Sequence, residues 1–344
     1  MCYDYIIVTH IPSFYKVNLY NELNTKLKIF VVFVAIDTIE RRASDFSTLQ
    51  NINFPYTVLS DKFLQKRDVK SNIRKLRAIL TNNCYKRLLV NGWDLKEFWY
   101  LIMLSPKSKN CLALESTIID SKTNGIKGLM KKIFLSRISL VFASGSLHLK
   151  LLHALNFRGT IKITKGVGII NKPNYVITDK KYRRKFVYIG RLTKVKNLEV
   201  IVKVFNNLPN HTLTIIGDGE EKEYLRSIAK HNIIFKPPIE NSKLQFELPN
   251  YDILILPSIR EPWGLVVEEA LYFGLPVMVS KNCGSIDLVK NGINGYIFDP
   301  LNEEEIKTLI LNIDDIIYEN LVKGVRRFSI HEKDLHQIKS YCFD

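Results

Sequence analysis

Cysteine is scarce in this sequence, and the few cysteines are widely spaced. The 344 residues include five, at positions 2, 84, 111, 283 and 342, and none belongs to a C-x-x-C pair. An odd number without a regular framework argues against a structural zinc site and favours a reducing compartment. The hydrophobic content of 46% and the charged content of 24% are those of an ordinary globular protein, not of a disordered or disulfide-rich chain.

Long apolar runs are also missing. The longest, Ile29 to Ile36, has the length of a strand and is too short to span a bilayer. The first residues carry Asp4 where a signal peptide has basic residues, and the apolar run that follows is short. We therefore expect no signal peptide, and we expect any membrane contact to be peripheral.

Acidic residues are scarce in only one half of the chain. Residues 1–170 hold 26 Lys and Arg against 11 Asp and Glu, whereas residues 171–344 hold 24 against 23. Nearly all of the net charge of +16 therefore belongs to the first half. This asymmetry indicates an anionic partner for that half, namely a membrane surface, a phosphorylated substrate or a nucleic acid. A solvated Lys-rich face without a partner is the alternative.

The length and the pattern of the chain predict two α/β domains. A chain of 344 residues exceeds what one hydrophobic core usually serves. Short β-rich runs alternate with helical patterns throughout, which is typical of βαβ units with a parallel sheet. We expect a first domain over residues 1–168, a linker over 169–184, a second domain over 185–328, and a tail over 329–344 that packs back on the first domain.

Two strand ends in the second half carry residues suited to a phosphate. A predicted strand ends at Gly190, where the missing side chain lets a ligand approach the backbone. Arg191 offers a planar fork for phosphate, and Lys196 adds a point charge before the next helix. An ordinary turn with exposed basic residues is the alternative. The turn Gly217-Asp218-Gly219 is a weaker signal of the same kind.

The segment from Glu261 to Glu269 is more specific. It follows a buried strand, so that Glu261 is expected on a loop at the strand's carboxyl end, and Gly264 punctuates the entry to a packed helix. The first N–H groups of that helix form an anion site. A carboxylate beside such a site is suited to sugar hydroxyls, and Glu269 is placed to reach a ribose. Two common solvated glutamates, one of them on the helix dipole, are the alternative.

The second half resembles the retaining glycosyltransferases of family 4, which have the GT-B fold of two Rossmann-like domains facing each other across a cleft. The resemblance is strongest over residues 186–300. The matching residues are Gly190-Arg191 with Lys196, Gly217-Asp218-Gly219, Pro257-Ser258, the E-x7-E pair Glu261 and Glu269, Gly284, and the run from Asn291 to Gly295.

The resemblance implies a role for each matching residue. Arg191 and Lys196 would neutralise the donor diphosphate, Glu261 would contact the transferred sugar, and Glu269 would bind the ribose. Backbone N–H groups near Gly264 would hold the sugar and the phosphate. The implied donor-binding residues are Gly190, Arg191, Lys196, Gly217, Asp218, Pro238, Ile239, Glu261, Gly264, Leu265, Val266 and Glu269.

The first half resembles the acceptor domain of bacterial members. The implied acceptor-side residues are Ser13, Phe14, Tyr15 and Lys16, which follow the first strand in place of the Gly-Gly loop of many relatives. Many relatives also carry a histidine after a mid-domain strand, where this sequence has Glu115 as the candidate catalytic residue. A helix-capping role for Ser116 or Thr117 is the alternative use of that stretch.

The resemblance implies a retaining, metal-independent transferase. Its donor would be a nucleotide sugar, with UDP preferred over GDP as the nucleotide and the base left open by the sequence. Its acceptor would be a lipid-diphosphate-linked oligosaccharide in O-antigen or another surface polysaccharide. No cofactor and no metal are expected, since the sequence contains no Asp-x-Asp and basic residues take the place of Mg²⁺. We expect a cytoplasmic protein that lies peripherally on the inner membrane.

A segment of the first half has the pattern of an interfacial helix. Its basic residues flank apolar ones, which would suit an anionic membrane surface. A buried core helix with a solvated basic face is the alternative. The basic residues are Lys127, Lys131, Lys132 and Arg137, and the apolar ones are Ile126, Leu129, Met130, Ile133 and Phe134.

Three other functions are less well supported. A sugar-nucleotide epimerase can share the fold, but the spacing of Glu261 and Glu269 together with Gly190-Arg191 is a transferase arrangement. A non-catalytic sugar-nucleotide-binding protein would share the donor residues. A nucleic-acid binder is disfavoured because the basic residues are dispersed and no recognition motif is present.

Overall fold

The computed structural model describes residues 2–40 and 42–343. The chain divides into two compact units. The N-terminal unit comprises Met1–Arg41, Phe46–Ile169 and Lys333–Asp344, and the C-terminal unit comprises Arg42–Asp45 and Ile170–Glu332. The last residues of the chain thus belong to the N-terminal unit, and a four-residue piece of the first half belongs to the C-terminal unit.

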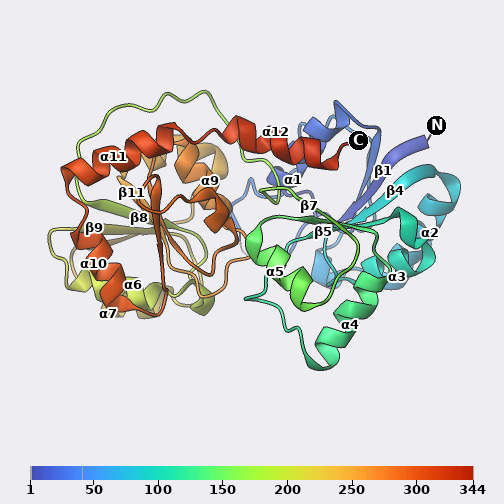
Figure 1. Ribbon diagram of the computed structural model, residues 1–344, viewed down its shortest axis with the longest axis horizontal. Coiled ribbons are helices and arrows are strands. Elements are labelled where there is room, and N and C mark those ends of the chain that lie inside the picture. Colours follow the sequence, from blue (N-terminus) through green and yellow to red (C-terminus); the bar gives the residue numbers. More distant parts are fainter. Residues whose placement is uncertain (1, 41, 344) are drawn as a thin grey trace. The chain divides into compact units, whose positions relative to one another are not determined.

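The N-terminal unit is built on a parallel seven-stranded sheet with the order β3-β2-β1-β4-β5-β6-β7 (Figure 1). Its strands are β1 (Cys2–Thr9), β2 (Ile29–Phe33), β3 (Tyr56–Val58), β4 (Cys84–Val90), β5 (Asn110–Leu114), β6 (Leu140–Ala143) and β7 (Thr160–Ile163). Its helices are α1 (Phe14–Asn24), α2 (Val69–Asn82), α3 (Lys96–Leu104), α4 (Gly125–Ser136), α5 (Ser146–Ala154) and most of α12 (Ile330–Tyr341), with short 3₁₀ turns η1 (Leu64–Lys66) and η2 (Lys107–Lys109).

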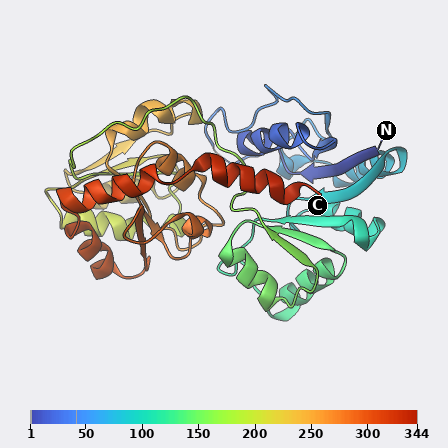
Figure 2. The ribbon, with the colours of Figure 1, turned by 45° about the horizontal axis from the view of Figure 1, so that its top comes forward.

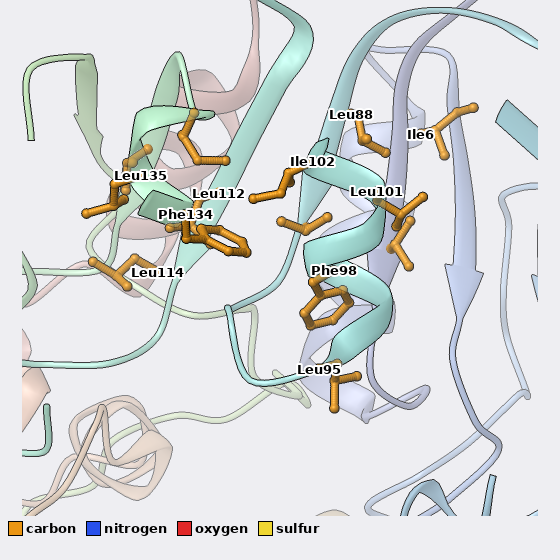
Figure 3. Packing of buried hydrophobic residues seen from close by; sticks show 14 of the residues in the cluster. Ile6, Leu88, Leu95, Phe98, Leu101, Ile102, Leu112, Leu114, Phe134 and Leu135 are labelled. Atoms are coloured by element: carbon orange, nitrogen blue, oxygen red, sulfur yellow. The ribbon is translucent and has the colours of Figure 1, made fainter. Parts of the chain in front are cut away.

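Helices cover both faces of this sheet because successive side chains of a strand point to opposite faces. Ile6 and Val8 of β1 join a core with residues of α2, α3, α4 and α5 (Figure 3). Tyr5 and Ile7 join a second core with residues of α1 and with Ile338 of α12. Strands buried on both faces explain the continuous apolar runs of the sequence. The hydroxyl of Tyr5 donates to the carbonyl of Tyr341 at 2.9 Å, which ties α12 to this unit.

The C-terminal unit has a parallel six-stranded sheet with the order β10-β9-β8-β11-β12-β13. Its strands are β8 (Lys185–Ile189), β9 (Thr212–Ile216), β10 (Ile233–Lys236), β11 (Ile253–Leu256), β12 (Val277–Ser280) and β13 (Gly295–Phe298). The helices, visible in Figure 2, are α6 (Leu198–Asn206), α7 (Lys222–Ile228), α8 (Leu244–Glu247), α9 (Leu265–Tyr272), α10 (Glu303–Leu311) and α11 (Asp315–Arg326). Four 3₁₀ turns complete the unit, η3 (Lys194–Lys196), η4 (Asn241–Lys243), η5 (Leu248–Asn250) and η6 (Gly284–Leu288).

The cysteines differ from the expectation of an unpaired set. Cys2 and Cys84 form a disulfide, with their Cα atoms 4.5 Å apart. The two residues are register partners on the adjacent parallel strands β1 and β4. Because 82 residues separate them in sequence, spacing alone could not reveal the pair. Among the described residues, no helix is both long enough and apolar enough to cross a membrane.

Candidate donor site

The topology of the C-terminal sheet singles out one position for a ligand. β8 lies between β9 and β11, so the strand order changes direction there. In open α/β sheets ligands bind at such a point, beyond the carboxyl ends of the strands. Gly190 follows β8, and the loop that carries Glu261 follows β11. The two strongest motifs of the sequence therefore end at the same place.

The structure joins two of the expected donor residues in an ion pair. Nζ of Lys196, in η3, contacts Oε2 of Glu261, and the two side chains are only 13% and 11% exposed. The hydroxyl of Ser258 donates to the same carboxyl oxygen at 3.2 Å. Arg191 is exposed, and its backbone carbonyl accepts a hydrogen bond from the Tyr188 hydroxyl at 2.8 Å. A cation and a carboxylate thus stand side by side at the strand ends.

Gly264 is required by the geometry of the loop. It precedes α9 with a φ of 89°, in the left-handed region that L side chains rarely adopt. A Cβ atom there would lie 2.9 Å from a methyl group of Leu256 and 3.1 Å from Sγ of Cys283. The close packing places the first turn of α9, with the N–H groups of Leu265 and Val266, next to Glu261.

Trp263 gives the loop a buried anchor that the sequence did not reveal. Its indole Nε1 donates to Oε1 of Glu268 at 2.6 Å, and the two residues are 3% and 0% exposed. Its carbonyl accepts from the N–H of Ser285 at 3.0 Å. Glu268 is thus held by the loop itself.

Glu269 lines a pocket of about 330 Å³ in the C-terminal unit. Burial raises the pKa of Glu269 from its ordinary value of 4.5 to about 7; a hydrogen bond from Asn241 lowers it, and the charges of Glu268 and Asp45 add to the increase. The walls combine amide and carboxyl groups with apolar surface. The lining residues are Asn171, Lys172, Pro173, Asn241, Ser242, Leu244, Gln245, Glu269 and Phe273.

The glycine turn after β9 packs directly against the turn after β8. A Cβ atom on Gly217 would lie 1.9 Å from the carbonyl oxygen of Gly190, so no side chain fits there. The N–H of Leu192 donates to the carbonyl of Asp218 at 2.9 Å. The carboxylate of Asp218 pairs with Lys222 at 3.2 Å. The structure therefore brings both predicted turns together.

Two of the expected donor-binding residues do not line the Glu269 pocket. Pro238 is exposed and Ile239 is half-buried, both after β10, and neither is among the residues that line this pocket. The adjacent Lys236 pairs with Glu247 at 2.5 Å. Their contact with the donor stays a prediction.

The expected acceptor-side residues are mostly buried. Ser13 and Phe14 are buried, 4% and 7% exposed, and Phe14 packs edge-on against Phe46 with ring centroids 6.0 Å apart. Tyr15 is half-buried, and its carbonyl accepts from the N–H of Ile169 at 2.9 Å. Lys16 is 5% exposed at its side chain and forms an ion pair with Glu115. The structure thus brings together two of the candidates, Lys16 and Glu115.

No helix begins directly after Glu115, so the alternative of a helix-capping role for Ser116 or Thr117 is wrong. The next helix, α4, begins at Gly125, with Asn124 at its N-cap position. Thr117 is fully buried, and its N–H and hydroxyl both donate to the Asp120 carboxylate, at 3.0 and 3.2 Å.

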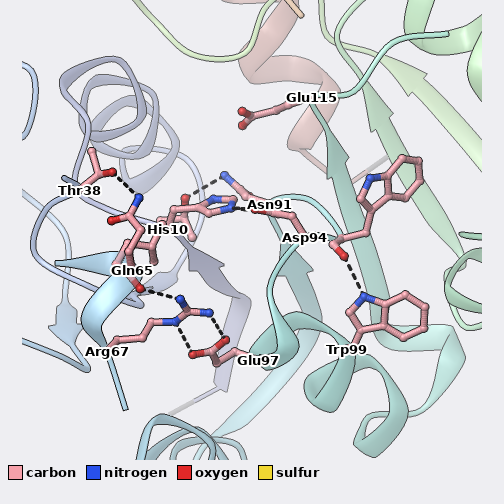
Figure 4. Close-up of polar contacts among 12 residues, drawn as sticks. His10, Thr38, Gln65, Arg67, Asn91, Asp94, Glu97, Trp99 and Glu115 are labelled. Atoms are coloured by element: carbon pink, nitrogen blue, oxygen red, sulfur yellow. Dashed lines mark hydrogen bonds and ion pairs between the residues drawn. The ribbon is translucent and has the colours of Figure 1, made fainter. Parts of the chain in front are cut away.

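Two polar pairs in the N-terminal unit escaped the sequence (Figure 4). His10, after β1, contacts the Asp94 carboxylate at 2.9 Å through Nε2. Burial raises the pKa of Asp94, but the hydrogen bond and charge of His10 outweigh this effect and the pKa is lowered. Arg67 holds Glu97 through two hydrogen bonds of 2.7 and 2.8 Å. Each pair joins residues far apart in sequence, so no local motif could show it.

The described residues contain no group of three or more His, Cys, Asp or Glu side chains arranged to hold a metal ion. Metal independence of the reaction stays a prediction.

Comparison with known proteins assigns the C-terminal unit. Residues 175–316 match the family model described as glycosyl transferases group 1. The matched segment lies within the C-terminal unit and includes the loop from Glu261 to Glu269. An uncharacterized glycosyltransferase of Methanocaldococcus jannaschii, MJ1607, is 28% identical over 47% of this chain and 42% of its own length. An uncharacterized 41.2 kDa protein in the cps region of Klebsiella pneumoniae is 23% identical over 66% of this chain and 58% of its own length.

Solved structures show the GT-B fold for the whole chain. The lipopolysaccharide outer core galactosyltransferase WaaB is 15% identical with a TM-score of 0.71, covering 99% of each chain. Anabaena HepE, solved with UDP and glucose, is 16% identical with a TM-score of 0.71, covering 96% of this chain and 97% of its own. At these identities the likeness concerns the fold alone. The chain spans 42% and 58% of the length of the two curated relatives above.

Proposed function

We propose that this protein is a retaining glycosyltransferase that uses a nucleotide sugar, UDP-linked rather than GDP-linked, as its donor. The observation that carries the proposal is the ion pair of Lys196 with Glu261, which lies on the loop before α9, together with Glu269 of α9, which lines a pocket. All three residues lie inside the segment that matches group 1 glycosyl transferases. Solved complexes of the similarly folded HepE with UDP and with UDP-glucose support a UDP-linked donor.

The charges at the strand ends suit a diphosphate leaving group. Arg191 and Lys196 would neutralise it, and the first N–H groups of α9 would add the positive end of the helix dipole. Glu261, held by Ser258, would accept hydrogen bonds from hydroxyls of the transferred sugar. Preorganised charge of this kind stabilises a departing phosphate without a metal ion.

The transfer itself would need no protein nucleophile. The acceptor oxygen forms a bond to the anomeric carbon on the face from which the diphosphate leaves, so the configuration is retained. The bond from that carbon to the phosphate oxygen breaks, and the departing phosphate takes the proton of the acceptor hydroxyl. The protein's contribution is positioning and electrostatic stabilisation.

The acceptor would be a lipid-linked oligosaccharide of a surface polysaccharide, bound by the N-terminal unit at an anionic membrane. The cps-region relative and the likeness to WaaB support the polysaccharide. The membrane is supported by α4, whose apolar residues Ile126, Leu129, Met130 and Ile133 are 80%, 59%, 49% and 46% exposed. Residues at these spacings share one helix face. Lys127 and Lys132, also exposed on α4, would attract anionic lipid.

A thermal-shift screen with UDP, GDP, ADP and CMP tests the proposal. A ligand at a hundred times its Kd stabilises a folded protein by about 2.7 kcal/mol, so we expect UDP to raise the Tm clearly and CMP to leave it unchanged. A panel of UDP-sugars then identifies the donor through release of UDP in the presence of a lipid-linked acceptor. Stabilisation by none of the four nucleotides would overturn the proposal.

A further inference from the structure

Asn241 occupies a central place in the pocket of Glu269. Its side-chain amide donates to Oε1 of Glu269 at 2.5 Å. Its side-chain oxygen accepts from the amide of Asn171 at 2.7 Å. The amide nitrogen and the amide oxygen of Asn241 are therefore both hydrogen-bonded, so Glu269 and Asn171 together fix the orientation of this side chain.

Asp45 fixes the backbone of the same residue. One carboxyl oxygen accepts from the N–H of Asn241 at 3.0 Å, and the other accepts from the N–H of Ser242 at 2.9 Å. A carboxylate at the start of a 3₁₀ turn satisfies N–H groups that the turn itself leaves unpaired. Nearby, the hydroxyl of Ser44 donates to Glu240 at 2.8 Å, which further secures the piece Arg42–Asp45 within the C-terminal unit.

We propose that Asn241 is a positioning residue of the donor site, held by Asp45 and Asn171, which fixes Oε1 of Glu269 and so presents the other carboxyl oxygen to the vicinal hydroxyls of a ribose in the pocket. The inference rests on the proposed function, because it assumes a nucleotide donor. It goes beyond that function because it assigns roles to residues outside the segment from Glu261 to Glu269.

The charges around Glu269 explain why such a residue is needed. A carboxylate accepts hydrogen bonds from hydroxyls best when it is ionised. Burial and the charges of Glu268 and Asp45 oppose ionisation, whereas the amide of Asn241 favours it. Lys172 is the cationic residue among those that line the pocket.

Binding measurements with two nucleotides test the inference. UDP and 2′,3′-dideoxy-UDP share the base and the diphosphate and differ only in the ribose hydroxyls. For Asn241→Ala we expect about tenfold weaker binding of UDP, the loss of roughly one charge-assisted hydrogen bond to the ribose, and unchanged binding of the dideoxy compound. Asp45→Asn should show the same selective loss at about threefold, since the side chain keeps its shape but has one acceptor oxygen fewer.

The control is Asn250→Ala. Asn250 is an exposed residue of η5 whose amide donates to the carbonyl of Phe246 at 3.0 Å, and its loss should leave both affinities unchanged. The Tm of each variant without ligand separates a folding defect from a binding defect. The ratio of the two Kd values is the decisive quantity, because it cancels any loss that affects both nucleotides.

The pH dependence of that ratio gives a second readout. The preference for UDP over dideoxy-UDP should fall as the pH drops through about 7, where Glu269 becomes protonated. In Asn241→Ala the midpoint should move to higher pH, because the hydrogen bond that lowers the pKa is gone. A merely structural role would not move this midpoint.

Different results overturn different statements. An equal loss of both nucleotides in Asn241→Ala, or no loss of either, would contradict the inference and leave the donor proposal intact. If the unmodified protein binds neither UDP nor another nucleotide, the proposed function fails, and the inference fails with it.

Discussion

Each unit of this protein contains a carboxylate held by a basic side chain, and the two pairs differ in how completely they are closed. Glu97 is fully buried and receives two hydrogen bonds from Arg67 and a third, of 3.3 Å, from Asn72. The guanidinium of Arg67 also donates to the carbonyl of Leu64 at 2.6 Å. Glu261, by contrast, has one contact from Lys196 and one from Ser258, and all of these act on a single oxygen.

The difference separates a pair that stabilises the fold from a pair that can serve a ligand. A buried carboxylate whose two oxygens both accept hydrogen bonds from the fold has little left to offer a substrate, and its loss is a loss of stability. A carboxylate with an oxygen to spare, at the carboxyl end of strands and beside a helix start, keeps the capacity to bind. Two units of the same architecture therefore give opposite expectations for the same kind of mutation.

The largest expected effect is on stability, from a mutation of the closed pair Arg67 and Glu97. Glu97→Gln should lower the free energy of unfolding of the N-terminal unit by about 3–5 kcal/mol, because it leaves the Arg67 charge buried without its partner. Urea unfolding followed by circular dichroism measures this value. Glu22→Gln, at an exposed position of α1, is the control. A cost below 1 kcal/mol would show that the pair is not structural, and the comparison would fail.

A mutation in the open pair, Lys196 and Glu261, should lower the rate of sugar transfer. Glu261→Ala should reduce sugar transfer by about 10²–10³-fold, the usual cost of removing one preorganised group from a transfer site. The Kd for UDP should change little, because the diphosphate and ribose contacts remain. Transfer rates and calorimetry with UDP measure the two quantities, with Glu304→Ala on the exposed side of α10 as control. Full transfer activity in Glu261→Ala would remove this residue from the mechanism.

The two units should also respond oppositely to pH. The pKa of Glu97 is lowered, since the bonds from Arg67 outweigh the effect of burial; its stabilisation is present above pH 4.5 and is lost as the pH falls through the lowered value. The pKa of Glu269 is raised to about 7, so stability is highest below pH 4.5 and declines as the pH rises to about 7.

Urea unfolding between pH 2 and pH 8 separates the two effects, because the loss at Glu97 lies below pH 4.5 and the decline at Glu269 lies between pH 4.5 and about 7. Glu269→Gln should remove the decline toward neutral pH in the C-terminal unit and leave the acid sensitivity of the N-terminal unit in place. Should Glu269→Gln leave the pH profile unaltered, the carboxyl group would have to titrate normally in the folded protein.

How far the sequence predicted this site depends on whether the partners are neighbours in the chain. Glu261, Gly264 and Glu269 were predicted because strand, loop and helix follow one another there, and each residue has a conformational or chemical reason within that run. The disulfide of Cys2 was missed because register on adjacent strands, not spacing, creates it.

The same limit applies to the pocket and to the sheet. Asn241 and Asp45 carry no local signal, since their function arises only from mutual contact across the fold. The short edge strand β7 has exposed or half-buried side chains, so it lacks the buried apolar run that is typical of the inner strands. The alternation of strands and helices was enough to predict both sheets, because βαβ units form a parallel sheet whose two faces are covered by helices.

The smallest expected effect concerns the difference in charge between the two halves. If α4 contacts an anionic membrane, Lys127→Gln should weaken binding to vesicles of anionic lipid by about 1 kcal/mol, roughly fivefold, and high salt should abolish the difference. Ile126→Gln should weaken binding at low and high salt alike, since its contribution would be apolar burial.

Ile316→Gln is the matched control, because Ile316 is 70% exposed on α11 of the C-terminal unit, whereas Ile126 is 80% exposed. Co-sedimentation measures all three. Equal effects of Ile126→Gln and Ile316→Gln would mean that the exposed face of α4 has no special affinity for lipid, and the charge asymmetry would then need another partner.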